Sequence, residues 1–243
     1  MYSLRSAYSA AAVRLAAPLA LLLLAGPASA EEFYYMAMFG AQTSPNNPDY
    51  SHTFATFVRA SGEGPCPTAY TVEDCFTISW LPSSLKIRLR ALWPECGHNF
   101  GLHETLRYAL SEDEHVSMWG PYRIDEELFY GAARQRDVLE SGQVRYQAID
   151  SGYPTDRVSN CIHAVSSSIS GWRVRVLSPW FGDTASWAIL QRFRPHIINA
   201  DETHQWVFDY LQLACYPITR RDFENPRRGP VRSAFSTMLG VER

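Results

Sequence analysis

The order of residue patterns along the chain limits what it can fold into, because strand-like segments come first and helix-like segments follow. Aromatic, β-branched and alternating residues bounded by turn clusters predict strands over residues 33–42, 52–60, 75–82 and 84–92. Apolar residues at helical spacing then predict helices over 101–114, 123–141, 184–194 and 201–214, with one more strand over 143–150. The order predicts the α+β class, with one domain over residues 31–243 that ends in a helical C-terminal extension.

The first thirty residues have the features of a targeting segment. Arg5 and Arg14 accompany an apolar run, and Ala28-Ser29-Ala30 forms a small-residue cleavage site. Proline and glycine interrupt the run, whereas a membrane-spanning helix needs roughly 20 apolar residues. We therefore expect a signal peptide over residues 1–30 and a secreted or periplasmic protein without a stable membrane span, rather than an uncleaved anchor.

The charge of the chain disfavours one class of partner. The net charge is −3, and it becomes −5 when Arg5 and Arg14 leave with the signal peptide. Sequence-independent binding of nucleic acid needs a basic surface. We therefore expect no nucleic-acid partner, and the basic tail around Arg227, Arg228 and Arg232 is expected to be solvated.

Five cysteines follow the leader, namely Cys66, Cys75, Cys96, Cys161 and Cys215. Export favours disulfide bonds, and an odd count leaves one thiol over. One arrangement pairs Cys66 with Cys75 across a short loop and Cys96 with Cys215 across the fold, although the sequence does not fix the connectivity. Cys161 is then free, and it is either a reactive thiol or an inert buried one.

The surroundings of Cys161 favour a reactive thiol. The stretch Tyr153–Gly171 carries a helical apolar stripe of Val158, Ile162, Val165 and Ile169. Ser159 or Asn160 is a natural N-cap, so Cys161 is expected in the first turn. Unpaired backbone N–H groups and the positive end of the helix dipole stabilise a thiolate there, and they can also stabilise an oxyanion.

A nucleophilic cysteine usually works with a histidine base. His163 is close in sequence, but two helical residues are turned roughly 200° apart and do not meet. His52 opens a predicted strand after a Pro/Asn/Asp turn, where its side chain can project over the end of a sheet. We select His52 as the base, with a turn histidine that caps a loop as the alternative interpretation.

The two segments "SHTFATFV" and "SNCIHAVSS" together resemble the circularly permuted NlpC/P60-like branch of the papain-like fold, which includes lecithin retinol acyltransferase-like proteins. In that branch a strand-opening histidine precedes a cysteine at the start of a helix. His52 and the run Asn160-Cys161-Ile162-His163 match this order. The resemblance implies a papain-like antiparallel sheet packed against the helix that carries the cysteine.

The resemblance also implies a mechanism and a substrate class. His52 takes the proton of Cys161, the thiolate attacks an amide or ester carbonyl, and an acyl-thioester forms and is cleaved. The implied substrate is a peptide or acyl-bearing molecule, such as a cell-wall peptide. The family's third polar residue maps to Ser79, or to Thr77 as second choice, and neither is the side chain usual in that role.

Other features suggest no metal or cofactor. Cys96, His98 and His103 match no standard zinc spacing. The leading hypothesis is an exported cysteine hydrolase of amidase or peptidase type. The competing hypotheses are a lipid acyltransferase, a non-catalytic exported binding or structural domain on the same scaffold, and a regulatory module that works through a reactive thiol.

Overall fold

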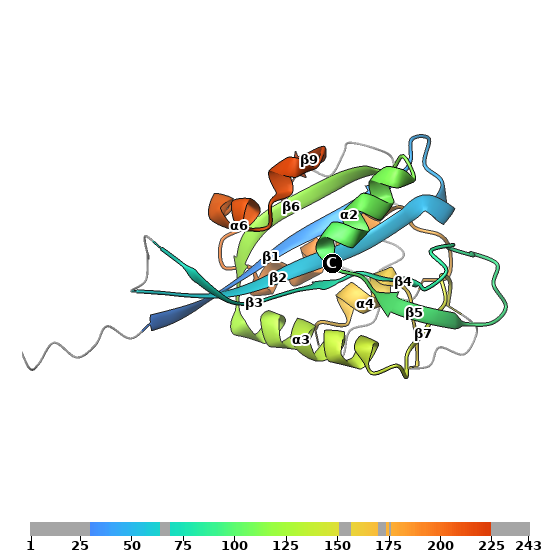
Figure 1. Ribbon diagram of the computed structural model, residues 1–243, viewed down its shortest axis with the longest axis horizontal. Helices are drawn as coiled ribbons and strands as arrows, with labels where there is room; N and C mark the ends of the chain where they lie inside the picture. The colour runs from blue at the N-terminus through green and yellow to red at the C-terminus, as the bar shows by residue number, and fades with distance from the viewer. Residues whose placement is uncertain (1–29, 64–68, 151–156, 170–173, 175, 225–243) are drawn as a thin grey trace, which may run out of the picture. The chain divides into compact units, whose positions relative to one another are not determined.

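The structure is a computed structural model of the chain, and it describes residues 30–63, 69–150, 157–169, 174 and 176–224. Residues 1–29 of the expected signal peptide, Cys66 and the basic tail lie outside the described residues. The chain divides into two compact units. The described part of the smaller unit is residues 30–32, 61–63 and 69–71, which include the outer ends of three strands, and the larger unit holds the rest of the described chain (Figure 1).

The larger unit is built on a main sheet with strand order β3-β2-β1-β6-β9. β1 pairs antiparallel with β6, and β6 pairs parallel with β9. A second sheet has the order β4-β5-β7-β8. The strands are β1 (Ala30–Gln42), β2 (Ser51–Glu63), β3 (Thr71–Ile78), β4 (Trp80–Pro82), β5 (Glu95–Asn99), β6 (His115–Ile124), β7 (Arg145–Tyr146), β8 (Val158–Ser159) and β9 (Ile218–Arg221).

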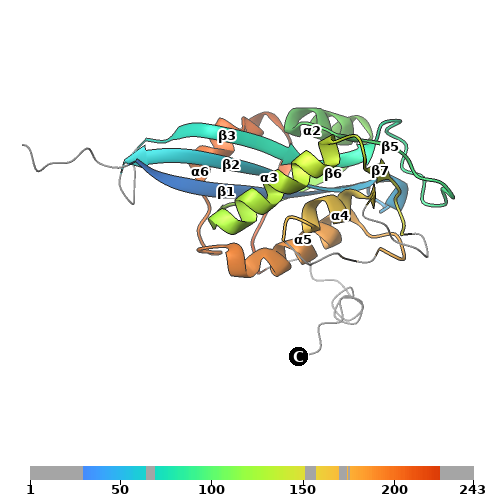
Figure 2. The ribbon, with the colours of Figure 1, turned by 90° about the horizontal axis from the view of Figure 1, so that it is seen from below.

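Helices cover both faces of the main sheet, with α2 on one side and α4 and α5 on the other (Figure 2). The helices are α2 (Leu102–Ser111), α3 (Glu126–Glu140), α4 (Cys161–Ser166), α5 (Gly182–Phe193) and α6 (Gln205–Tyr210), with short 3₁₀ turns η1 (Pro48–Tyr50), η2 (Arg194–His196) and η3 (Leu213–Cys215). The mixture of sheets and helices confirms the α+β class.

Side chains alternate between the two faces of the sheet, as a pleated strand requires. On one face Met38, Ala55 and Ile78 join the apolar cluster that contains α3, α4 and α5 residues. On the other face Phe39 and Phe54 stack with ring centroids 4.8 Å apart. Because of this alternation, consecutive residues of one strand place their side chains on opposite faces of the sheet.

Two helices start directly after residues whose side chains cap the first turn. The Asp125 side chain accepts a hydrogen bond from the Leu128 backbone N–H, so α3 begins at Glu126. The Asn160 side chain accepts from the His163 backbone N–H, so α4 begins at Cys161. α4 ends at Ser166, earlier than the apolar stripe indicates.

Strand β6 is absent from the sequence prediction, which started a helix at residue 123. Its pairing with β1 shifts register between Met36 and Met38, where Gly120 and Pro121 insert an irregularity. Trp119 and Tyr122 consequently both join the same apolar cluster although they lie three residues apart. The alternation of side chains between the two faces is therefore interrupted in the middle of β6, so the sequence pattern does not indicate a strand there.

The prediction of a strand over residues 84–92 is wrong. Residues 83–94 form an irregular connection between β4 and β5 that begins with a turn, in which the Leu85 N–H bonds to the Pro82 carbonyl at 2.8 Å. Leu85 has a left-handed backbone with φ of 56°. Partly buried and exposed side chains nevertheless alternate along residues 85–90, with Lys86, Arg88 and Arg90 exposed.

The predicted strands over 75–82 and 143–150 are also shorter or divided. Ser79 separates β3 from β4, so residues 75–82 contribute one strand to each of the two sheets. Within residues 143–150, only Arg145–Tyr146 pairs as a strand.

The expected Cys96–Cys215 disulfide is absent, because Cys75, Cys96, Cys161 and Cys215 are all free thiols in the described chain. Among the described residues no helix is long and apolar enough to cross a membrane.

Candidate functional site

Cys161 lies in the first turn of α4, as its sequence context predicted. Its side chain is buried, with 9% of the residue exposed. The Asn160 amide anchors the turn, because it accepts from the His163 N–H at 2.9 Å and donates to the Ala148 carbonyl at 3.2 Å. The sulfur therefore has a fixed place at a helix start.

Burial, rather than the helix start, decides the protonation of this sulfur. Burial raises the pKa of Cys161 to about 11, although the backbone N–H groups of Thr53, Ile162 and Cys161 itself act to lower it. The charge of Glu114 also raises it. The helix start was expected to favour a thiolate at Cys161. This expectation is wrong, because the cost of burying a charged sulfur exceeds the stabilisation that the backbone N–H groups give it.

The cavity beside Cys161 is small. A pocket of about 30 Å³ is enclosed by the segments that follow β1 and β4, by β7 and by the start of α4. Its lining includes Ser51, Leu89, Tyr146, Cys161 and Trp180. A volume of this size holds about one water molecule, so the pocket as it stands admits no peptide or acyl group.

His52 lies at the start of β2 and points into a polar network. Its Nε2 is 2.9 Å from the Ser79 Oγ, and the Thr105 hydroxyl of α2 donates to the same Oγ at 2.7 Å. Only 2% of His52 is exposed, and burial lowers its pKa to about 3. The ring is therefore neutral over the physiological range.

The structure does not bring the His52 imidazole to the sulfur. His52 stacks on Phe54, which stacks on Phe39, so the imidazole faces the side of the sheet covered by α2. The next residue, Thr53, bonds to Gly182 and Ser186 of α5 on the opposite side, and its N–H faces Cys161. The two candidate side chains thus lie on opposite faces of β2, although the Thr53 backbone next to His52 reaches the sulfur.

Ser79, which the resemblance implies as the third polar residue, lies beside His52. Ser79 returns beside His52 and bonds to its ring, while Thr77 pairs with Thr56 at 2.9 Å. The Nδ1 of His52 has no hydrogen-bond partner among the described residues. The contact is therefore a buried polar pair on the α2 face, and it orients the ring away from α4.

Two buried acids near α4 were not found by sequence reasoning. The Asp150 carboxylate lies 3.3 Å from the His163 Nε2, and both side chains are almost fully buried. Asp150 also accepts from the Val176 N–H at 2.8 Å, which fastens that segment beside α4. Glu114 is buried as well, and burial followed by the charge of Glu112 raises its pKa to about 8. No spacing in the sequence signals these contacts.

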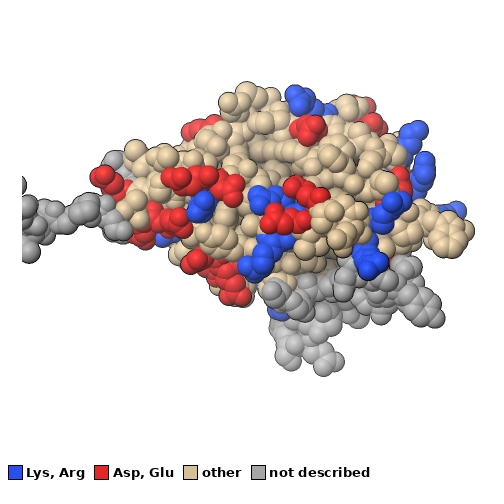
Figure 3. Space-filling view, turned by 60° about the horizontal axis from the view of Figure 1, so that its bottom comes forward, with Lys and Arg blue, Asp and Glu red and all other residues tan. Residues whose placement is uncertain are grey.

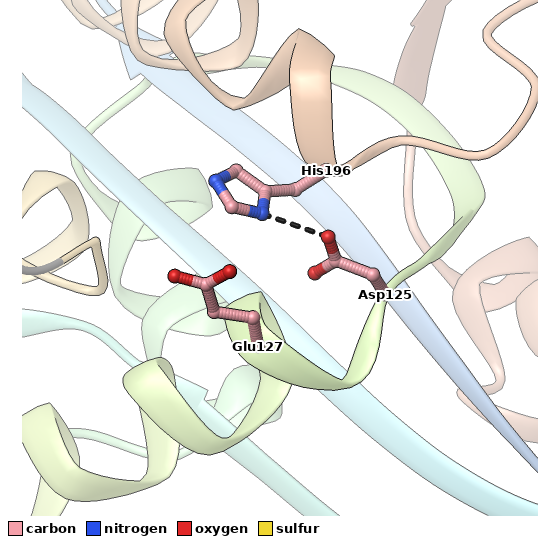
Figure 4. Close-up of side chains that lie close together, drawn as sticks. All are labelled: Asp125, Glu127 and His196. Atoms are coloured by element: carbon pink, nitrogen blue, oxygen red, sulfur yellow. Dashed lines mark hydrogen bonds and ion pairs between the residues drawn. The ribbon is translucent and has the colours of Figure 1, made fainter.

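The residues considered for zinc do not gather. The His98 ring meets the Phe100 ring edge to face, and the His103 Nδ1 bonds to the Tyr216 hydroxyl at 2.9 Å. Within the described chain, the group of potential metal ligands is instead Asp125, Glu127 and His196, whose ligand atoms lie within 4.8 Å of one another (Figure 4). The His196 Nδ1 is 2.8 Å from Asp125, so protein contacts already account for this pair.

No protein-family model matches this chain, and the comparisons with curated proteins and with solved structures found no match either.

Proposed function

We propose that this chain is an exported binding or structural domain that works without a catalytic cysteine. The observation that carries the proposal is the direction of two side chains. A base must reach the proton that it removes, directly or through one water. The His52 imidazole is bonded to Ser79 on the α2 face, whereas Cys161 lies on the α4 and α5 face.

The protonation of both groups supports the same proposal. A neutral His52 ring and a Cys161 thiol whose pKa burial raises to about 11 disfavour the thiolate–imidazolium pair of a cysteine hydrolase. The pocket beside the sulfur, of about 30 Å³, has no room for the scissile group. Burial inside an apolar cluster is a common state for a free cysteine that serves packing.

We also propose kinship with the permuted NlpC/P60-like branch as the origin of this scaffold. What supports it is the order of a strand-opening His52 and a helix-starting Asn160-Cys161, and the packing of that helix against a sheet face. On such a scaffold Cys161 and His52 are retained positions with a packing role. A shared fold leaves the activity to be decided by the site.

Alkylation of the native protein at neutral pH tests the proposal. Iodoacetamide is added, and labelling of each cysteine is followed by peptide mass spectrometry. A thiol pKa of about 11 instead of 9.0 leaves about 100-fold less thiolate, and burial slows access further. We expect exposed Cys96 and Cys215 to react first and Cys161 to remain unlabelled. Labelling of Cys161 at or above the rate of Cys96 would contradict the proposal.

The exported hydrolase or acyltransferase is the second candidate. The observation that favours it is the set of backbone N–H groups around the sulfur, which would serve as oxyanion donors if the pocket opened. An acylating thiol probe of broad specificity tests it. Capture of the probe by wild type, and its loss in both Cys161→Ser and His52→Gln, would support catalysis over the non-catalytic domain.

A further inference from the structure

The connection between β4 and β5, residues 83–94, is held firmly although it is irregular. The Tyr108 hydroxyl of α2 donates to the Leu85 carbonyl at 2.7 Å, and the Gln147 amide donates to the Ala91 carbonyl at 3.2 Å. Ile87 and Leu89 pack against the apolar cluster of the larger unit. The connection therefore presents its outer side chains from a fixed backbone.

The inward packing of Ile87 and Leu89 turns the intervening basic residues outward. Lys86, Arg88 and Arg90 are all exposed. Within the described chain, the Lys86 ammonium and the Arg88 and Arg90 guanidinium groups make no ion pair or hydrogen bond; the one such bond of Lys86 is from its backbone N–H to the Ser84 hydroxyl. The segment 83–94 contains no acidic residue. Its outer side therefore carries three cations, and the adjoining carboxylate, that of Glu95, is bonded to the Ser84 hydroxyl at 2.8 Å rather than to any of them.

Two large apolar side chains follow these cations directly. Leu92 is 85% exposed and Trp93 is 82% exposed, the highest values among the exposed large apolar residues of the described chain. Single exposed apolar residues are common. An adjacent leucine and tryptophan beside three unpaired cations differ from a single exposed apolar residue. A partner that binds here must accommodate apolar and positively charged side chains together.

Figure 3 shows several Lys and Arg side chains near the right-hand end of that view, which is also where Figure 1 draws the β4–β5 connection. A lipid bilayer with anionic headgroups offers negative charge at its surface and apolar material just below it. Tryptophan prefers this interface, where its ring is buried and its N–H stays wet.

We propose that residues 83–94 dock this domain on an anionic lipid surface, with Lys86, Arg88 and Arg90 at the headgroups and Leu92 and Trp93 inserted between them. This rests on the proposed function as a binding domain and names its partner. The fixed backbone means that little ordering is needed on binding, which favours affinity. The contact is peripheral and reversible, since the inserted apolar area is small.

Vesicle sedimentation tests the proposal. The protein is expressed with its own leader, its N-terminus is read by mass spectrometry, and it is mixed with vesicles of phosphatidylcholine alone or with added phosphatidylglycerol. We expect binding only to the anionic vesicles, and its loss at about 1 M salt, where the screening length falls to about 3 Å. Equal binding to neutral vesicles would contradict the proposal.

Variants separate the two parts of the surface. Replacing Lys86, Arg88 and Arg90 by Gln is expected to weaken partitioning about fivefold for each cation removed. Leu92→Ser with Trp93→Ser is expected to weaken it by about tenfold. The matched control replaces Arg134, Arg192 and Arg220 by Gln, which removes the same charge from exposed positions outside the connection. If the control loses as much binding as the first variant, the assignment of the surface is wrong.

The outcomes distinguish this inference from the proposed function. A soluble polyanion that competes fully, together with wild-type binding by the Leu92/Trp93 variant, would mean an anionic polymer partner and would overturn the lipid assignment. Alkylation of Cys161 tests the absence of catalysis separately, because the cysteine does not belong to this surface. Failure of vesicle binding with an inert Cys161 would therefore reject only the lipid inference.

Discussion

At the scale of single residues, burial sets the protonation of the candidate groups more strongly than neighbouring charges do. Burial is the largest cause of the pKa shifts of His52, Glu114 and Cys161. All three are held in the form that carries no charge at moderately acidic pH. The same property that makes them poor acid–base catalysts makes the stability of the fold depend on pH.

The raised pKa of Glu114 predicts that the fold loses stability as the pH rises. Its pKa is about 8 in the folded chain against an ordinary value of 4.5, so its contribution is complete below pH 4.5 and is lost as the pH rises toward about 8. Glu114→Gln removes this titration. In urea unfolding between those limits, the free energy of unfolding of the variant relative to wild type should rise with pH, by at most about 1.4 kcal/mol per pH unit. A pH-independent difference would contradict the prediction.

The lowered pKa of His52 predicts that the fold loses stability as the pH falls. Its folded pKa of about 3 lies below the ordinary 6.5, so the unfolded chain binds the proton more tightly between these values. Stability is complete above pH 6.5 and is lost as the pH falls toward about 3. Relative to wild type, His52→Gln should therefore become more stable as the pH falls through this range. The same urea measurement checks it, and a difference that grows toward high pH would refute it.

Ser79 is expected to matter for stability because two buried groups bond to its hydroxyl, His52 and Thr105. Ser79→Ala leaves both without this partner, at a cost of about 1–3 kcal/mol in the free energy of unfolding. Ser84→Ala is the control, because Ser84 makes an exposed bond to Glu95 and its loss should be nearly neutral. Equal effects of the two variants would show that the His52 network is not stabilising.

At the scale of elements, α3 and α4 approach so closely that one position accepts only glycine. A Cβ placed on Gly131 of α3 would lie 2.0 Å from the Ser168 carbonyl oxygen, just after α4. Gly131→Ala is therefore expected to destabilise the fold by about 1–3 kcal/mol through overpacking.

Helix propensity alone predicts the reverse sign for Gly131→Ala, a gain of about 1 kcal/mol. Thermal unfolding of Gly131→Ala and of Gln135→Ala in the same helix decides between them, since the second variant changes propensity without a clash. A Gly131→Ala variant with a raised melting temperature would contradict the close contact of α3 and α4.

The elements found from the sequence are those with a clear period or a local cap. β1, β2, α3 and α4 follow from apolar runs, from Asp125 and from Asn160, because such signals are local. β6 was missed because Gly120 and Pro121 interrupt its alternation. Residues 84–92 alternate like a strand, yet the alternation reflects packing of Ile87 and Leu89 on the core rather than pairing.

Part of the candidate site could be predicted because it also depends on local signals in the sequence. Cys161 at a helix start and Ser79 beside His52 follow from cap and hairpin geometry. The face to which His52 points depends on strand phase relative to the whole sheet, and one residue changes it to the other side. Burial of Glu114 and Asp150 depends on long-range packing, so the sequence gives no signal for it.

At the scale of the whole molecule, the core and the surface of the protein have different roles. The interior holds a protonated thiol and a neutral imidazole on opposite faces of the main sheet, and the β4–β5 connection carries the groups proposed to bind. Export, and a single domain over residues 31–243, remain predictions from the sequence.

NMR titration of the His52 ring, in wild type and in Cys161→Ala, tests the separation of the two side chains most directly. The account predicts a neutral ring from neutral pH down to about pH 4, with the titration unchanged when the sulfur is removed. A His52 ring that is charged at neutral pH, and that loses this charge in Cys161→Ala, would mean that the two groups form an ion pair, and it would contradict the account.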